Sequence, residues 1–421
     1  MLNIIFSFVA LVFLLALIAY VLVLVANNSR ILALTQQRVD LEAEELKAKI
    51  KNIMERGELE AKQVKLAWSG FRKFKIISKV KETDDISSFY LAPHDGKELP
   101  GFNPGQFLTF QVHLPNHPQP VIRCYSLSDS PFYPDRYRVT IKRILASKDG
   151  TSQTPGLVSN YFHDHINEGD IVDVKAPAGH FYLQMTKKTP VVFIAGGVGI
   201  TPLLSMLNTI TEMGSQREVW FFLGVRNKKE HMMREHLEMV EREFENVHLS
   251  IFYSNPEETD VLNEDYHHKG RITVEKIKGI VPSNNFDFYI CAPPLMVKVL
   301  KKDLIDWGVP KNNIHFEAFG PDTVKGCKPD AGKKDGAKLN VKFERSGKTL
   351  VWEPNIASLL DFAEANGISI DSGCRAGNCG TCLTAIKSGS VELVGEPGSE
   401  PESGSCLTCI SIPRGDISLD A

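Results

Sequence analysis

The chain opens with a long apolar run. Between Leu2 and Ala26 the only strongly polar residues are Asn3 and Ser7, and no side chain is charged. A helix of that length spans about 37 Å at about 1.5 Å per residue, whereas the hydrocarbon core of a bilayer is about 30 Å thick. The pattern predicts a transmembrane anchor over residues 1–27.

A cleaved secretory signal is the competing interpretation of this run. The apolar stretch is longer than a typical signal core, no basic residue precedes it, and VANNS at 25–29 is a poor cleavage site. The segment that follows is rich in basic residues, namely Arg30, Arg38, Lys47, Lys49 and Lys51. We therefore expect a single-pass membrane protein whose C-terminal part is cytoplasmic.

Residues 28–68 are rich in Leu, Ala, Glu, Lys and Gln, with Leu46, Ile50 and Ile53 at helical spacing. This composition predicts a helical stalk. The apolar repeat is short and Gly57 interrupts it, so a solvated spacer is favoured over a coiled-coil dimer.

Residues 69–184 and 185–320 differ in their patterns. The first segment contains short β-rich runs between Gly, Pro and Asp, among them FKIISKVKE, QFLTFQVHL, RYRVTIKRI and DIVDVKAP. This spacing predicts an antiparallel barrel or sandwich. In the second segment strands alternate with helical stretches such as HMMREHLEMVEREF, which predicts a parallel sheet with helices on both faces.

A Gly-, Lys- and Asp-rich linker at 321–338 separates these segments from residues 339–421. KLNVKFERSGKTLVWEP predicts a β-hairpin that turns at Ser346-Gly347. NIASLLDFAEANG predicts a helix capped by Asn355 and ending near Gly367. A cysteine-rich segment follows this helix.

Composition narrows the classes of function. The 421 residues carry a formal net charge of −3, so the chain lacks the basic excess typical of nucleic-acid binding. Eight cysteines are enough for several disulfides, but five of them lie between residues 374 and 409. Disulfide frameworks belong mainly to small secreted domains, so the clustering indicates reduced thiols at a metal site.

These thiols are compatible with two kinds of metal site. A zinc site would use Cys379-x-x-Cys382 and Cys406-x-x-Cys409, but residues 383–405 between the pairs exceed the usual ~15–20, and Cys374 would have no role. An iron–sulfur site would use Cys374, Cys379 and Cys382 in the C-x4-C-x2-C spacing of plant-type [2Fe–2S] proteins, with a distant fourth cysteine. The spacing favours iron.

Two segments of the β-rich region carry groups that suit a pyrophosphate. RCYSLSDSP places Arg123 and Tyr125 on a strand, and GLVSNYFHDHINEGD begins a helix with Gly156-x-x-Ser159. Each residue alone has an ordinary interpretation, such as strand surface for Arg123 or a helix N-cap for Ser159. Together they offer a cation, free backbone N–H groups and an aromatic ring.

VVFIAGGVGITPLLSMLNTI combines an apolar strand, a glycine-rich turn and an amphipathic helix. Gly197 and Gly199 permit close approach of a ligand, and the helix N-terminus after Thr201 favours a phosphate. The dinucleotide fingerprint is incomplete because Pro202 replaces its third glycine. The alternating strands and helices that follow strengthen the prediction of nucleotide binding.

With these motifs in order, residues 71–321 resemble the ferredoxin reductase-type flavoprotein module. RCYSLSD, GLVSNYFHDH, APAGHFYL and IHFEAFGP resemble the reductase half of flavohaemoglobins in particular. The resemblance implies that Arg123 meets the FAD pyrophosphate, that Tyr125 lies against the flavin and its ribityl chain, and that Ser126 hydrogen-bonds near the flavin N5. It also assigns two residues of the next motif to FAD, Gly156 and Ser159.

The same resemblance locates a nicotinamide site. It places Glu317 near the flavin and the nicotinamide, and puts Ser126 and Cys291 with it at the site of hydride transfer. The family usually reads Cys-Gly-Pro where this chain has Cys291-Ala292-Pro293. Arg226 in GVRN is either a ligand of a 2′-phosphate or a surface residue, so both NADH and NADPH stay open, although the resemblance favours NADH. The nucleotide loop falls on Gly196, Gly197, Gly199 and Thr201.

Residues 339–421 resemble a plant-type ferredoxin, which implies an α+β domain of the β-grasp type. The family's fourth cluster ligand stands in a sequence like LTC, which matches Leu407-Thr408-Cys409. The resemblance therefore implies that Cys406 is a neighbour and that the ligands are Cys374, Cys379, Cys382 and Cys409.

The sequence thus predicts a multidomain, membrane-anchored reductase with a FAD-binding β-barrel, an α/β NAD(P) domain and a [2Fe–2S] domain. Electrons from NAD(P)H would pass through FAD and the cluster to a partner redox protein such as an oxygenase, hydroxylase or desaturase. The layout resembles oxygenase reductase components and the reductase of hybrid cluster protein. A quinone reductase-type respiratory component is one alternative, and a membrane-tethered redox sensor or assembly factor is an alternative of another class.

Overall fold

The computed structural model describes residues 17, 18, 20, 22, 66–115, 117–145, 155–319, 339–353, 356–395, 397 and 401–421. The chain divides into two units, Met1–Lys65 and Leu66–Ala421. The expected anchor (1–27) and stalk (28–68) lie almost entirely outside the described residues.

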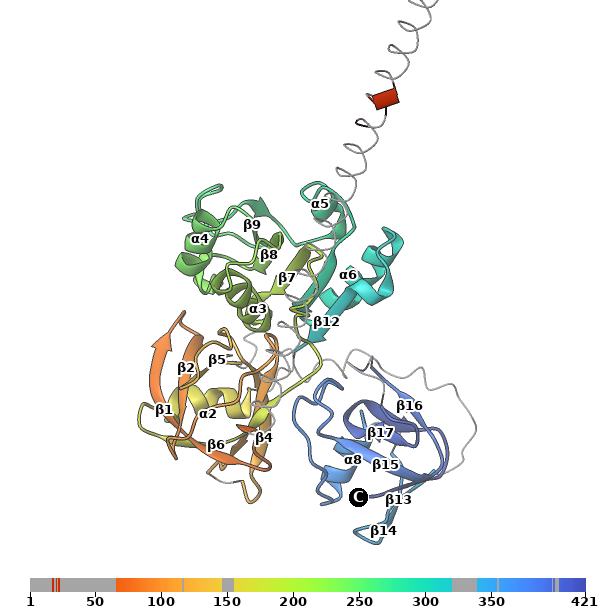
Figure 1. Ribbon diagram of the computed structural model, residues 1–421. Coiled ribbons are helices and arrows are strands. Elements are labelled where there is room, and N and C mark those ends of the chain that lie inside the picture. The colour runs from red at the N-terminus through yellow and green to blue at the C-terminus, as the bar shows by residue number, and fades with distance from the viewer. Residues whose placement is uncertain are drawn as a thin grey trace, which may run out of the picture. The chain divides into compact units, whose positions relative to one another are not determined.

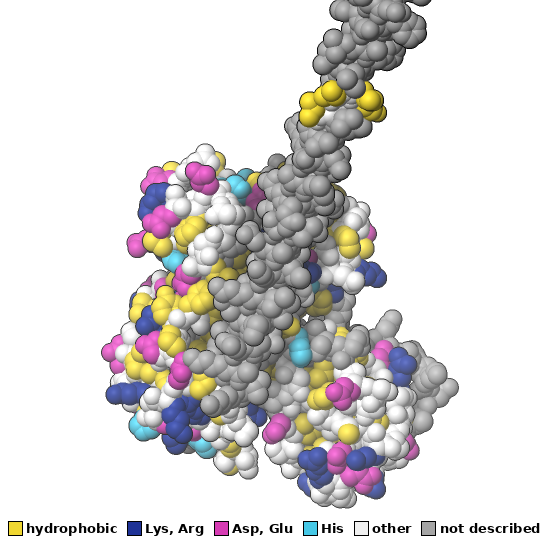
Figure 2. All heavy atoms as spheres, in the orientation of Figure 1, with side chains coloured by type: hydrophobic (Ala, Val, Ile, Leu, Met, Phe, Trp, Pro, Cys, Tyr) yellow, Lys and Arg dark blue, Asp and Glu magenta, His cyan; other side chains and the backbone are white. Residues whose placement is uncertain are grey.

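The described residues of the first unit are few and apolar. They are helical and exposed: Leu17, Ile18, Tyr20 and Leu22 (Figure 2). Over the part of the chain that the structure describes, no helix is long and apolar enough to cross a membrane.

A six-stranded antiparallel sheet with strand order β4-β3-β6-β1-β2-β5 forms the first folded part of the second unit (Figure 1). Leu127, directly after β4, bridges Val139 of β5, so the two outer strands meet and the sheet closes into a barrel. The predicted barrel is confirmed. Its strands are β1 (Arg72–Lys81), β2 (Ile86–Pro93), β3 (Phe107–Val112), β4 (Val121–Ser126), β5 (Tyr137–Lys142) and β6 (Ile171–Ala178).

Helix α2 (Leu157–His165) packs on this barrel, with Phe162 at the centre of an aromatic cluster. Phe162 of α2 lies edge-on to Phe89 at 5.3 Å and to Phe110 at 5.4 Å between ring centroids. Such edge-to-face pairs contribute about 0.5–1.5 kcal/mol beyond the area they bury. Phe162 also lies 5.7 Å from the ring of Tyr125, so the helix packs against the strand that carries the RCYS motif, β4.

A six-stranded parallel sheet with strand order β10-β9-β8-β7-β11-β12 follows. It confirms the predicted α/β domain. Its strands are β7 (Val191–Gly196), β8 (Val219–Val225), β9 (Val247–Tyr253), β10 (His268–Lys269), β11 (Asp287–Ala292) and β12 (Ile314–Ala318). Its α-helices are α3 (Ile200–Glu212), α4 (Arg234–Glu243), α5 (Val274–Lys278) and α6 (Pro294–Asp306), and its short 3-10 helices are η1 (Gly197–Gly199), η2 (Lys228–Glu230) and η3 (Lys311–Asn313).

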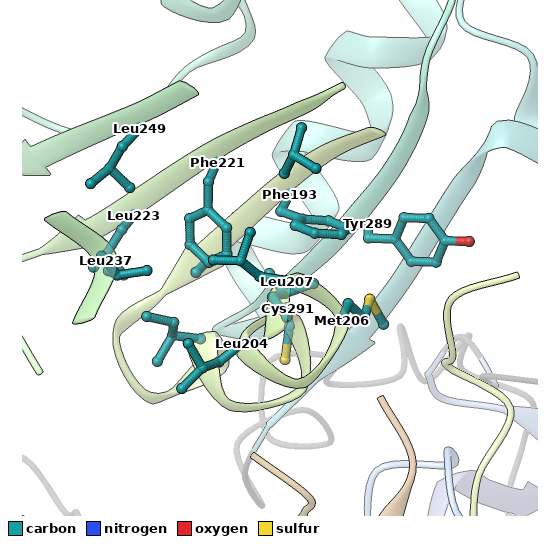
Figure 3. Close-up of a cluster of buried hydrophobic side chains, with 14 of the residues drawn as sticks. Phe193, Leu204, Met206, Leu207, Phe221, Leu223, Leu237, Leu249, Tyr289 and Cys291 are labelled. Atoms are coloured by element: carbon teal, nitrogen blue, oxygen red, sulfur yellow. The ribbon is translucent and has the colours of Figure 1, made fainter. Parts of the chain in front are cut away.

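Both faces of this sheet are buried. Alternate residues of β7 point to opposite faces, so Phe193 belongs to the core beneath α3 and α4, and Ile194 to the core beneath α5 and α6. Figure 3 shows the first core, where Leu204 and Leu207 of α3 lie among the side chains of β7 and β8. This packing fixes the start of α3, which follows the glycine-rich turn.

Residues 340–419 form a five-stranded sheet with order β14-β13-β19-β15-β17 and a two-stranded sheet of β16 and β18. The hairpin predicted at Ser346-Gly347 is present, with Gly347 at φ +67°. The elements are β13 (Asn340–Phe343), β14 (Lys348–Val351), α8 (Leu359–Ala365), β15 (Leu383–Ser388), β16 (Val391–Leu393), β17 (Ser405–Leu407), η4 (Thr408–Ile410), β18 (Ser411–Pro413) and β19 (Ile417–Leu419).

The helix of this domain begins later than predicted. Ser358, and not Asn355, caps α8, because the Ser358 hydroxyl accepts a hydrogen bond from the backbone N–H of Asp361 at 3.1 Å. Asn355 lies outside the described residues. The predicted end near Gly367 fits, since Gly367 adopts φ +69° two residues after the last helical residue.

Candidate active site and cluster site

Arg123 and Tyr125 lie on β4 of the antiparallel barrel. The Tyr125 ring packs edge-on against Phe110 at 5.6 Å and Phe162 at 5.7 Å, and burial raises its pKa well above the ordinary value. Arg123 donates to the Ile122 carbonyl at 2.7 Å, and burial lowers its pKa. Among the described residues no carboxylate pairs with Arg123 within 4.0 Å, so this guanidinium suits an anionic ligand such as a pyrophosphate.

Gly156 and Ser159 form the start of α2. Gly156 is the N-cap, and no side chain caps the first turn. A Cβ on Gly156 would lie 2.3 Å from Ser159 Oγ and 2.9 Å from Ile144 Cβ, so only glycine fits there. The Ser159 hydroxyl donates to the Gly156 carbonyl at 3.3 Å. The first backbone N–H groups of α2 therefore have no side-chain acceptor and can donate to a ligand or to solvent, as phosphate binding at a helix N-terminus requires.

The glycine-rich turn packs against the end of β11. A Cβ on Gly199 would lie 2.1 Å from the Cys291 carbonyl oxygen, which only glycine allows. A Cβ on Gly196 would lie 2.9 Å from the Ala292 methyl group. Glycine at 196 thus accommodates the methyl group by which this chain departs from Cys-Gly-Pro. Thr201 is buried in the first turn of α3 and donates to the Val198 carbonyl at 3.1 Å.

Cys291 and Glu317 lie next to each other on β11 and β12, in register. Both are buried. Burial raises the pKa of Glu317 to about 8 and raises the pKa of the Cys291 thiol. Glu317 is therefore a neutral carboxylic acid near pH 7, able to donate a hydrogen bond. One of its oxygens, Oε2, has no hydrogen-bond partner among the described residues.

A cavity opens beside Glu317. Its wall combines residues from all three folded parts of Leu66–Ala421: His180, Phe181, Ile314, His315, Phe316, Glu317 and Asn378. The Asn378 side-chain amide donates to the Ala318 carbonyl at 3.2 Å. No sequence pattern pointed to Asn378, because its contact depends on how a loop of residues 373–382 meets a strand far away in the chain.

A second contact that the sequence did not reveal joins the barrel to α3. The Asp129 carbonyl accepts from the Ser205 hydroxyl at 2.7 Å, and its carboxylate accepts from the Asn208 amide at 3.0 Å. Asp129 lies three residues beyond Ser126, which is buried at the end of β4. The strand that ends in Ser126 is therefore tied to the helix that follows the nucleotide loop.

Arg226 stands apart from these residues. It follows β8, its side chain is 74% exposed, and its Nε lies 3.5 Å from Glu230 Oε1. The carboxylate neutralises much of the charge that a 2′-phosphate would meet.

Cys374 and Cys379 form the first pair of predicted cluster ligands. The backbone N–H of Cys374 donates to Cys379 Sγ at 3.3 Å. Three N–H groups donate to Cys374 Sγ at 3.3–3.4 Å, those of Ala376, Asn378 and Cys379. Backbone amides directed at sulfur are the arrangement expected around an iron–sulfur cluster.

Cys382 and Cys409 form the second pair, with 3.1 Å between their sulfur atoms. Two pairs suit a [2Fe–2S] cluster, in which each iron takes two protein ligands. Cys406 is fully buried in the core with Ile417 and Leu419, and burial raises its pKa to about 12.

Comparison with known proteins agrees with this arrangement. Three family models match consecutive parts of the chain: an oxidoreductase FAD-binding domain over residues 73–182, an oxidoreductase NAD-binding domain over 193–302 and a 2Fe-2S iron-sulfur cluster binding domain over 341–414. A flavohemoprotein of Bacillus cereus is 42% identical over 254 residues, which are 60% of this chain and 62% of the relative. The chain thus spans less than two thirds of that relative.

Two solved structures extend the comparison. The flavohem-like FAD/NAD-binding domain of nitric oxide dioxygenase from Vibrio cholerae is 31% identical with a TM-score of 0.53, over 60% of this chain and 100% of that one. Phthalate dioxygenase reductase is 26% identical with a TM-score of 0.55, over 84% of this chain and 98% of that one.

These matches define an oxidoreductase with FAD-binding, NAD-binding and 2Fe-2S domains in that order. The chain belongs to the ferredoxin reductase-type flavoprotein family, in which its FAD/NAD-binding part is of the flavohaemoglobin type. Its cofactors are FAD, NAD(P)H and a [2Fe–2S] cluster.

Proposed function

We propose that this protein is a membrane-anchored electron-transfer reductase that passes electrons from NAD(P)H through FAD and the [2Fe–2S] cluster to a partner redox protein. The observation that carries the proposal is the position of the cluster loop. Its Asn378 donates to the carbonyl of Ala318, the residue after Glu317. The loop that holds the cluster ligands therefore reaches the edge of the proposed hydride-transfer site.

Different residues bind FAD, bind the nicotinamide nucleotide and lie at the hydride-transfer site. Arg123, the start of α2 and Tyr125 hold FAD, and the turn from Gly196 to Thr201 receives the pyrophosphate of the nucleotide. Glu317 keeps its proton near pH 7 and lies beside Cys291 at the hydride site. When bound, FAD accepts a hydride and releases its electrons singly, which the one-electron cluster requires. One NAD(P)H then reduces two one-electron acceptor molecules, and NAD(P)⁺ and one proton are released.

The charges after β8 support NADH as the preferred donor. Each basic residue of this segment lies beside a carboxylate: Arg226 with Glu230 at 3.5 Å, Lys228 with Asp265 at 2.9 Å and Lys229 with Glu257 at 2.8 Å. A 2′-phosphate would add a negative charge next to these carboxylates. The ribose of NADH brings no such charge.

The partner is proposed to be an oxygenase, hydroxylase or desaturase. Phthalate dioxygenase reductase, which is similar over 84% of this chain, is by its name the reductase of a dioxygenase. The apolar run at residues 2–26 supports an anchor in the membrane, with the catalytic part on the cytoplasmic side.

Anaerobic reduction of the full chain tests the proposal. NADH should first bleach the flavin absorbance and then produce the paramagnetic signal of a reduced [2Fe–2S] cluster, and turnover with cytochrome c should follow. A protein loaded with both cofactors that shows neither change with NADH or NADPH would overturn the enzyme function and favour a sensor or an assembly factor.

A further inference from the structure

The cluster loop lies against the strand that carries the FAD-binding motif. Gly373, directly before Cys374, has no room for a side chain: a Cβ placed there would lie 2.8 Å from Cys124 Sγ. The next neighbours would be Cys379 Sγ at 3.1 Å and Thr381 Oγ1 at 3.2 Å. Gly373 is absent from the glycines with positive φ, so glycine is needed at 373 for space and not for backbone conformation.

Cys124 presents its sulfur to this loop from β4. It stands between Arg123 and Tyr125, and because side chains alternate along a strand, it points to the opposite face from both. Its Sγ lies 3.5 Å from Thr109 Oγ1 of the neighbouring strand β3.

The same loop is held at a second point. Asn378 donates to the Ala318 carbonyl at 3.2 Å at the end of β12. Residues 373–379 are thus fastened to the NAD-binding part at Ala318 and rest on the FAD-binding part at Cys124. A loop fixed at two points has little freedom to change the separation between the cluster ligands and β4.

We propose that the contact between Gly373 and Cys124 sets the distance for electron transfer from FAD to the cluster. The absence of a side chain at 373 lets the cluster loop approach the strand of the RCYS motif. The Cys124 sulfur limits how closely the loop can approach. Both are positioning residues, because neither is assigned to FAD or to the cluster. The inference rests on the proposed function, and it identifies residues that position the cluster for electron transfer from FAD.

Gly373→Ala in the full, cofactor-loaded chain is the first test. The added methyl group meets Cys124 Sγ and should push the loop away from β4. Electron transfer slows as the distance between donor and acceptor increases, so we expect cluster reduction to slow several-fold. Flavin reduction by NADH and the iron content should not change. Rapid mixing followed by absorbance and freeze-quenched paramagnetic resonance separates the two steps.

Gly415→Ala is the matched control. It makes the same substitution in the same domain, at a glycine with nothing within 4 Å of the added Cβ and without positive φ. Its cluster should be reduced at the wild-type rate.

The double variant Gly373→Ala, Cys124→Ala distinguishes a contact between domains from a local effect. Removing the Cys124 sulfur removes the nearest obstacle to the new methyl group, so the double variant should recover most of the lost rate relative to Cys124→Ala alone. If the slow phase persists in the double variant, the methyl group acts through Cys379 or Thr381 and the proposal is wrong. A wild-type rate in Gly373→Ala would also overturn it.

Cys124→Leu covers the case in which Gly373→Ala loses its cluster. This change enlarges the opposing side chain and leaves the cluster domain untouched, so slow cluster reduction at full iron content supports the proposal and a normal rate defeats it. Failure of wild-type protein to reduce its flavin or its cluster with NADH or NADPH would instead count against the proposed function.

Discussion

Cys291 and Glu317 occupy paired positions on two adjacent parallel strands, and both side chains are withdrawn from water. The strand pairing places a carboxyl group at the proposed hydride site without an ion pair within 4.0 Å among the described residues. A buried carboxyl without a cation remains protonated well above its ordinary pKa. The barrel, the parallel sheet and the cluster loop meet around this neutral acid.

Glu317→Gln should remove a pH-dependent cost in stability. Burial raises the pKa of Glu317 to about 8, above the ~4.3 of a solvated glutamate. The folded protein keeps this proton while the unfolded chain releases it, so the contribution to stability is greatest below about pH 4 and declines as the pH rises to about 8. Glutamine does not titrate. The variant should therefore gain in Tm over the wild type as the pH is raised through this range.

A control for this measurement is Glu275→Gln on α5, where the side chain is 88% exposed. Its Tm should follow that of the wild type across the pH range. Parallel curves for Glu317→Gln and the wild type would show that the Glu317 carboxyl is ionised in the folded protein.

Arg123→Ala should weaken FAD retention. The substitution removes a guanidinium that has no carboxylate partner within 4.0 Å among the described residues. Loss of a charge-assisted contact with the pyrophosphate costs about 1.5–3 kcal/mol, roughly 10- to 10²-fold in the dissociation constant. Equilibrium dialysis of FAD measures this loss. Arg136→Ala removes a barrel arginine that lies over the Tyr133 ring and should leave FAD affinity unchanged; equal losses in both variants would mean that Arg123 supports the fold.

Arg226→Ala should have little effect on either nicotinamide donor, because the Arg226 side chain is 74% exposed and already pairs with Glu230. Exposed ion pairs contribute about 0–1 kcal/mol. The KM values for NADH and NADPH should both stay near those of the wild type. A KM that rises for NADPH alone would assign Arg226 to a 2′-phosphate and contradict the proposed preference for NADH.

A chain that begins at Leu66 should be soluble and retain FAD and activity with artificial acceptors, since the second unit starts there. Trp68 belongs to this unit: its Nε1 donates to the Val174 carbonyl at 3.0 Å and its ring lies 5.6 Å from Phe74. A chain that begins at Ser69 loses both contacts and should have a lower Tm. If the Leu66 chain lost its FAD, the preceding residues would be part of the reductase fold.

Local patterns predicted the barrel, the parallel sheet and the first three cluster cysteines, because the signal for each lies in residues close together in the sequence, whereas Cys409 followed from the resemblance to plant-type ferredoxins. The C-x4-C-x2-C spacing is one such pattern, since it places Cys374, Cys379 and Cys382 on one loop. The contacts of Gly373 with Cys124 and of Asn378 with Ala318 join segments from different domains, and no local pattern encodes them. The predicted cap of α8, Asn355, was wrong, because Asn and Ser are both good N-caps and the local sequence does not distinguish Asn355 from Ser358, which caps the helix.

Cys409→Ser and Cys406→Ser test which cysteine completes the cluster. Cys409 Sγ lies 3.1 Å from Cys382 Sγ, whereas Cys406 is buried in the core and paired in register with Thr384. Replacing Cys409 exchanges a soft thiolate for a hard oxygen, which iron in such clusters holds poorly. Cys409→Ser should therefore lose the red-brown colour and most of its iron, while its flavin is still reduced by NADH. Cys406→Ser should keep the cluster spectrum, with a modest loss of Tm because a hydroxyl enters an apolar site. The opposite pattern would move the fourth ligand to Cys406, and a colourless wild-type protein that contains zinc would exclude the cluster.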